Sequence, residues 1–135
     1  PLQCVQNASA RLVTETRMQD YITPALQQLH WLLIKYRIIY KLSVLMHLVH
    51  IGHSPSYLST LVTATSNLAS RRSLRSACSQ RYEIPRTALK FGERAFSFAG
   101  PSAWNSLPTY LHEQSDTKLF KAQLKTFLFS IAFLC

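Results

Sequence analysis

The stretch GERAFSFAGPSAWNSLP, residues 92–108, carries three aromatic rings, two prolines and two glycines but only one acid and one base. Large aromatic side chains supply much of the apolar surface that a small domain buries, so this composition favours packing over chemistry. The expected core anchors are Phe96, Phe98, Trp104 and Leu107. The expected turn residues are Gly92, Gly100, Pro101 and Pro108. We further expect Asn105 to satisfy a backbone group and Glu93 and Arg94 to lie on the surface.

Residues 2–13, at the start of the chain, have the spacing of a weakly amphipathic helix. One face of this predicted helix carries Leu2, Val5, Ser9 and Leu12. Turned mostly away from that face are Gln3, Gln6, Asn7 and Arg11.

Two cap-plus-proline pairs predict further helix starts. Thr23 followed by Pro24 predicts a helix that runs to about His30, because proline at the first helical position loses no hydrogen bond. Ser54 followed by Pro55 predicts a short helix. One side of that short helix would carry Leu58, Leu61 and Val62.

The end of the chain predicts another helix, which Ser115 or Asp116 caps. Its apolar stripe consists of Leu119, Phe120, Leu124, Phe127, Leu128 and Ile131. The opposite face carries Lys118, Lys121 and Lys125. The apolar run at its end is too short to cross a bilayer by itself.

Residues 31–52 form the most apolar part of the chain, yet three cations interrupt the run, which argues against a membrane span. A helical wheel instead predicts a long core helix with an exposed basic face. Its core arc would hold Ile34, Ile38, Ile39, Leu42, Leu45, Met46 and Val49. Its exposed arc would hold Tyr36, Arg37, Tyr40, Lys41, Ser43, His47 and His50.

The charge of the chain is strongly positive, with 15 Lys and Arg against six Asp and Glu, or +9 at pH 7. No carboxylate occurs between Asp20 and Glu83. A surface without acids keeps a positive potential that attracts phosphate backbones or anionic lipid headgroups. Cations that alternate with aromatic rings also suit single-stranded nucleic acid, through phosphate contact and base stacking.

We therefore predict an RNA- or DNA-backbone interface without sequence preference. Its residues are Tyr36, Arg37, Tyr40, Lys41, Arg71, Arg72, Arg75, Arg81, Arg86 and Lys90. Two plainer interpretations stay open: a solvated helix surface with tyrosines at its margins, and a basic linker.

Catalytic patterns are missing from the sequence. The six acids occur singly, whereas two-metal nucleotidyl transfer needs closely placed carboxylates. The three glycines stand apart from one another and form no phosphate loop. No acid or cysteine lies near His47, His50 and His53 in the sequence, which argues against a zinc site. We instead interpret them as histidines near a helix C-terminus, where the helix dipole favours them. We expect no catalytic residue, cofactor or metal.

These patterns together predict a mostly α fold: a small helical assembly with a basic irregular loop, as a piece of a larger protein. The expected organisation is a helical region over residues 1–65, the basic loop over 66–90, and an aromatic turn segment with a helix over 91–135. Cys4, Cys78 and Cys135 are odd in number and widely spaced, which favours reduced thiols. No secretory signal pattern is present, and we expect an intracellular protein of the nucleus or cytoplasm.

Six segments, in order, resemble the C-terminal region of the reverse transcriptase of LINE-type, non-LTR retrotransposons. They are LQCVQNASARLV, ITPALQQLHWLLIKYRI, GHSPSYLSTLV, RRSLRS, IPRTALKFGERAFSFAGPSAWNSLP and FKAQLKTFLF. The resemblance covers residues 2–129, downstream of the catalytic palm.

The resemblance implies a thumb or post-thumb region of an RNA-directed DNA polymerase, which helps to hold nucleic acid. No catalytic residue of the palm or of the endonuclease is carried over. RNA or DNA and the palm of the parent polyprotein are the implied partners. The alternatives are a structural or interaction remnant without selected activity, and a peripheral membrane association through the C-terminal helix.

Overall fold

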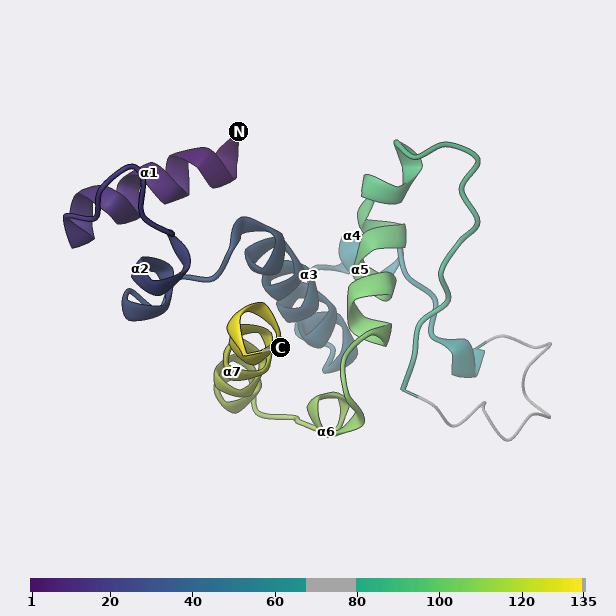
Figure 1. Ribbon diagram of the computed structural model, residues 1–135. Coiled ribbons are helices and arrows are strands. Elements are labelled where there is room, and N and C mark those ends of the chain that lie inside the picture. Colours follow the sequence, from purple (N-terminus) through teal and green to yellow (C-terminus); the bar gives the residue numbers. More distant parts are fainter. Residues whose placement is uncertain (68–79, 135) are drawn as a thin grey trace. The chain divides into compact units, whose positions relative to one another are not determined.

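The structure is a computed structural model that describes residues 1–67 and 80–134 (Figure 1). It is mostly α-helical, as the sequence predicts. Contacts divide the chain into two units, Pro1–Tyr40 with Gln123–Cys135, and Lys41–Ala122. These units cut across the predicted division at residues 65 and 90, since the first unit combines both ends of the chain.

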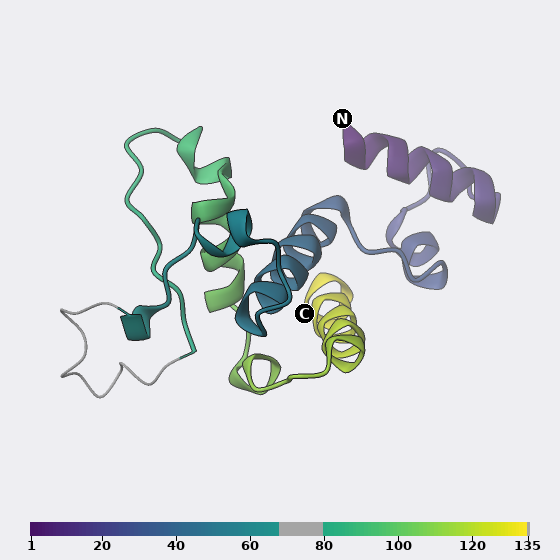
Figure 2. The same cartoon turned by 180° about the vertical axis from the view of Figure 1, so that it is seen from behind.

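The first unit contains α1 (Leu2–Thr14), α2 (Thr23–Gln28), the start of α3 (Ile34–His50) and the end of α7 (Thr117–Phe133). Figure 2 shows the short α2 close to α1, which it contacts. The helix α2 begins at Thr23 itself and not after it, and it ends before His30, whose φ is 51°. Buried in this unit are Gln6, Ala10, Ala25, Leu26, Leu32, Leu124 and Leu128.

The helix α1 is turned the opposite way from an ordinary amphipathic surface helix, which buries its apolar face. Leu2, Val5 and Leu12 are 68, 64 and 82% exposed, while Gln6 is buried. The amides explain this orientation, because Gln6 Nε2 donates to Leu32 O at 2.7 Å and Gln3 Oε1 accepts from Ile34 N at 2.9 Å. Gln3 thus satisfies one of the free amide groups at the start of α3.

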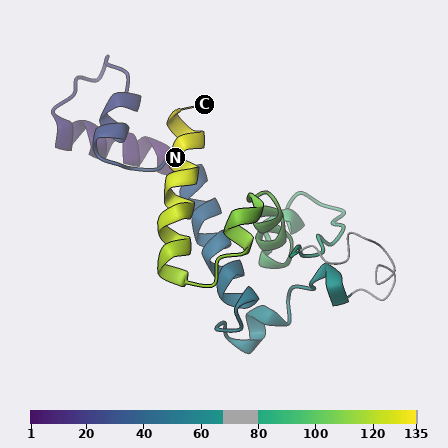
Figure 3. The same cartoon turned by 90° about the horizontal axis from the view of Figure 1, so that it is seen from below.

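The second unit contains the rest of α3, α4 (Ser56–Ser59), η1 (Thr65–Asn67), η4 (Gly92–Arg94), α5 (Phe96–Asn105), α6 (Thr109–His112) and the start of α7. Within this unit the end of α3 lies beside the first turns of α7 (Figure 3). Pro55 precedes α4, one residue later than the cap predicted at Ser54. The predicted cap of α7 is confirmed, since Asp116 Oδ1 accepts from Lys118 N at 2.8 Å.

Trp104 lies at the centre of the second unit with no exposed surface. Five rings surround it, and we call this group the Trp104 core: His47, His50, Tyr82, His112 and Phe120. Leu107 is also buried, whereas Phe96 and Phe98 are half-buried. The predicted packing role of Trp104 and Leu107 is therefore confirmed.

The turn predicted at Gly100 and Pro101 is wrong, because both residues lie inside α5. Gly100 is needed for close packing and not for a turn. A Cβ there would lie 2.9 Å from Sδ of Met46 on α3, a distance that real Cβ atoms do not reach. Gly92 and Pro108 lie at the start of η4 and before α6, as expected of turn residues.

The exposed face predicted for α3 is wrong at Ser43 and His47, which are fully buried, and Ile38 of the predicted core arc is 54% exposed. The reason is aromatic packing: the His47 ring stacks on Phe120 at 4.0 Å between centroids, with 5° between the planes. A neutral imidazole can pack in this way like any aromatic ring. The stripe predicted for α7 is buried at Phe120, Leu124 and Leu128, while Leu119 and Ile131 are exposed.

Candidate nucleic-acid interface

Residues 80–90, which we call the basic segment, lie between η1 and η4 in the second unit. The side chains of Arg81, Arg86 and Lys90 are all exposed, as the sequence predicts for a contact surface. No ion pair engages these three side chains within the part of the chain that the structure describes. Glu83 is exposed on the same segment, so the positive charge is interrupted once.

The start of the basic segment is fixed through its backbone. Trp104 Nε1 donates to Gln80 O at 2.8 Å. Thr65 donates to Arg81 O from both its backbone N and its Oγ1, each at 3.0 Å. The Asn105 side chain hydrogen-bonds to both backbone groups of Tyr82: Oδ1 accepts from Tyr82 N at 3.0 Å, and Nδ2 donates to Tyr82 O at 2.8 Å. The expectation that Asn105 satisfies a backbone group is thus confirmed.

The first turns of α3, in the first unit, hold the second group of predicted residues. Arg37 is exposed, and its guanidinium carbon lies 5.9 Å from the centroid of the Trp31 ring. The neighbouring Lys35 is exposed as well, with Nζ 5.8 Å from the centroid of the Tyr36 ring. Both distances fall within the range of cation–π attraction. Tyr36 and Tyr40 are half-buried, which leaves only part of each ring for a ligand.

The remaining predicted residues fall in different places. Lys41 is exposed, but it belongs to the second unit. Arg71, Arg72 and Arg75 lie outside the described residues. The structure therefore brings Tyr36, Arg37 and Tyr40 together in one unit, and Arg81, Arg86, Lys90 and Lys41 occur in the other. Sequence reasoning left Lys35 out of the interface, although its alternation with Tyr36 was the available signal.

Three histidines, His47, His50 and His112, pack around Trp104. Burial lowers the pKa of both His47 and His50, and the neighbouring histidine charge lowers each further. The expectation that the helix dipole favours their charged form is therefore wrong for these two. His112 Nε2 lies 2.8 Å from Trp104 O, and its ring stacks on the indole. In residues 1–67 and 80–134, no three His, Cys, Asp or Glu side chains gather as metal ligands would.

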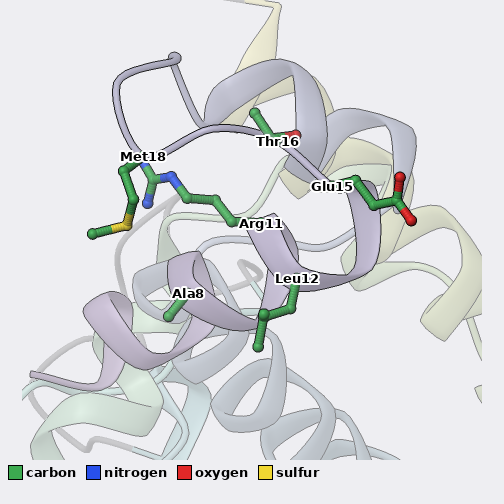
Figure 4. A pocket seen from close by; sticks show the side chains of 6 residues that line it. All are labelled: Ala8, Arg11, Leu12, Glu15, Thr16 and Met18. Carbon is green, nitrogen blue, oxygen red and sulfur yellow. The ribbon is translucent and has the colours of Figure 1, made fainter.

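A shallow depression of about 500 Å³ lies along α1 in the first unit, and no sequence pattern predicted it. Its lining residues are Ala8, Arg11, Leu12, Glu15, Thr16 and Met18 (Figure 4). Arg11 Nε is buried without a hydrogen-bond partner, while its terminal nitrogen donates to Asp20 O at 3.4 Å. The depression is mostly apolar and offers one cation and one acid.

Nothing in the described helices is long and apolar enough to cross a membrane. Comparisons with protein-family models, curated proteins and solved structures gave no match to the chain.

Proposed function

We propose that this chain is a non-catalytic, C-terminal piece of a LINE-type, non-LTR retrotransposon reverse transcriptase that contacts RNA or DNA backbones. The proposal rests on the sequence resemblance and on the excess of cations in the chain. Phosphate contacts supply most of the affinity of sequence-tolerant binding, and such contacts need accessible cations. The palm of the parent polyprotein would be the second partner.

The observation that carries the proposal is the exposure of Arg81, Arg86 and Lys90 on a segment whose start, residues 80–83, is held through its backbone. Arginine forks match phosphate oxygens in a bidentate way. Because no ion pair engages these side chains in the described part of the chain, a phosphate need not displace a protein carboxylate.

The start of α3 supports the same function. Lys35 and Arg37 are exposed beside partly accessible rings, the combination with which proteins hold the backbone and bases of single strands. A base can stack on the face of such a ring, and the neighbouring cation can then reach the adjoining phosphate. This support favours single-stranded RNA or DNA over a duplex.

A salt titration with fluorescently labelled single-stranded RNA tests the proposal. We expect binding at about 50 mM salt that weakens steeply with added salt, by about 0.7 in the log–log slope for each phosphate contacted. Changing Arg81, Arg86 and Lys90 together to Ala should reduce the slope by about 2, the effect of three lost contacts.

The matched control changes the three exposed lysines of α7, Lys118, Lys121 and Lys125, together to Ala. It removes the same charge from a surface outside the proposed interface, so the slope should change less. Equal slopes for the two triple variants would mean that only net charge matters. Absence of binding to single-stranded RNA and DNA at about 50 mM salt would end the proposal.

A second candidate, an interaction region without nucleic-acid binding, is favoured by the exposed apolar residues of α1. Changing Leu12, which is 82% exposed, to Lys would weaken such an interaction and leave nucleic-acid binding unchanged.

A further inference from the structure

We infer that Asn105 is a positioning residue for the proposed interface: by fixing the register of residues 80–83, it holds the Arg81 side chain out for a phosphate. The inference rests on the proposed function. It assigns a role in binding to a residue in the aromatic stretch, which otherwise serves packing.

Four consecutive residues of the basic segment have backbone groups held by the same unit. The Trp104 indole bonds to residue 80, Thr65 to residue 81 and Asn105 to residue 82. Residue 83 follows, where Glu83 N donates to Thr63 O at 2.8 Å. An extended segment held at every residue cannot slide along its neighbour without breaking several of these bonds at once.

The register decides which side chain meets the solvent. Tyr82 forms an isolated antiparallel bridge with Ala64, and in such a pairing successive side chains point to opposite sides. Tyr82 is buried against Trp104, with ring centroids 6.3 Å apart and 83° between the planes, whereas Arg81 and Glu83 are exposed. A slip of one residue would turn Arg81 towards the core and Tyr82 towards water.

Asn105 is the side chain best suited to prevent that slip. Its carboxamide offers one acceptor and one donor, and both are used on one residue, as a neighbouring strand would use them. An aspartate could accept from Tyr82 N but could not donate to Tyr82 O. Trp104 contributes one bond, but its removal would disrupt the core, whereas Asn105 is only half-buried.

The phenolic end of Tyr82 adds a second restraint on the same register. Tyr82 Oη lies 3.4 Å from His50 Nδ1, and burial raises the pKa of this tyrosine. The phenol therefore stays neutral and can donate to the imidazole. This contact holds the ring inward and leaves Asn105 to hold the backbone.

A double-variant cycle on the full chain tests the inference, with Asn105→Ala and Arg81→Ala made singly and together. In the unaltered background Arg81→Ala should lower the salt slope for single-stranded RNA by about 0.7, one phosphate contact. Asn105→Ala should lower it by the same amount. The double variant should show no further loss, because Arg81 is then already out of place. Hydrogen exchange at the Tyr82 amide should be faster in Asn105→Ala.

Two further variants separate positioning from general damage. Asn105→Asp keeps the acceptor but loses the donor. Its salt slope and the hydrogen-exchange rate of its Tyr82 amide should lie between those of the unaltered protein and those of Asn105→Ala. Ser106→Ala removes the hydroxyl of the neighbouring exposed residue, which donates to Ala103 O at 2.7 Å, and should change neither the slope nor the exchange rate.

The outcomes separate this inference from the proposal on which it rests. Suppose that the unaltered protein binds RNA and that Arg81→Ala lowers the salt slope by the same amount in the unaltered background and in the Asn105→Ala background. In that case the inference is wrong and the proposed function stands. If the unaltered protein binds no nucleic acid, both are wrong. If Asn105→Ala fails to fold, the same comparison is made with Asn105→Asp.

Discussion

The helix α1 and the Trp104 core place apolar and polar residues in opposite ways. In α1 the large apolar side chains Leu2, Val5 and Leu12 face the solvent, while Ala10 is buried and two glutamines hydrogen-bond to the rest of the unit. In the Trp104 core the aromatic rings are buried, and polar groups at their edges hold the basic segment. A helical pattern therefore identifies an amphipathic helix, but the partner atoms decide which face is buried.

The largest expected effect comes from Trp104→Ala. Trp104 has no exposed surface and contacts five rings, so the variant should lose about 3–5 kcal/mol of unfolding free energy. Urea unfolding followed by circular dichroism measures the loss. The control Phe91→Ala removes a ring that is 80% exposed and should stay within about 0.5 kcal/mol of the unaltered protein. Similar losses for both variants would contradict the packing of the core.

A smaller loss is expected from Gln6→Ala, which tests the polar attachment of α1. The change removes the donor that reaches the buried Leu32 carbonyl at 2.7 Å, and an unsatisfied buried acceptor costs about 1–3 kcal/mol. The same urea experiment, read from the loss of helix signal, measures it.

The matched control on α1 is Leu12→Lys, because Leu12 is 82% exposed. It should change the unfolding free energy by no more than about 0.5 kcal/mol. A larger loss from Leu12→Lys than from Gln6→Ala would mean that α1 packs through its apolar face, and the comparison between the two regions would fail.

The smallest expected effect is a decrease in stability on acidification. Burial lowers the pKa of His47 and His50 below the value of about 6.5 that histidine has in the unfolded chain. At pH values between the lowered pKa values and about 6.5, the unfolded chain therefore binds more protons than the folded one. The contribution is complete above about pH 6.5 and is lost as the pH falls through the lowered values of the folded protein. We expect the unfolding free energy of the protein to decrease between about pH 7.5 and 5.5.

Urea unfolding at the two pH values measures this loss, and a pair of variants assigns it. His50→Gln should flatten the dependence on pH, because it removes one of the two imidazoles whose pKa is lowered by burial. His53→Gln removes an exposed histidine outside the Trp104 core and is the matched control. If the unfolding free energy depends on pH equally in the two variants, the core histidines do not cause the effect.

The sequence by itself determined the helical class, the approximate segments of α1, α2, α3, α4 and α7, the Asp116 cap and the exposed cations of the basic segment, but not α5 or α6. These features are local, because periodicity, cap residues and charge act over a few neighbouring residues. Tertiary structure decided which faces are buried, because burial depends on atoms far away in sequence. His47 is inside because Phe120 lies against its ring, and a glycine fits at position 100 because a Cβ there would lie only 2.9 Å from Met46 Sδ. Only the fold brings Asn105 to Tyr82, 23 residues away, and so sets the outward direction of Arg81.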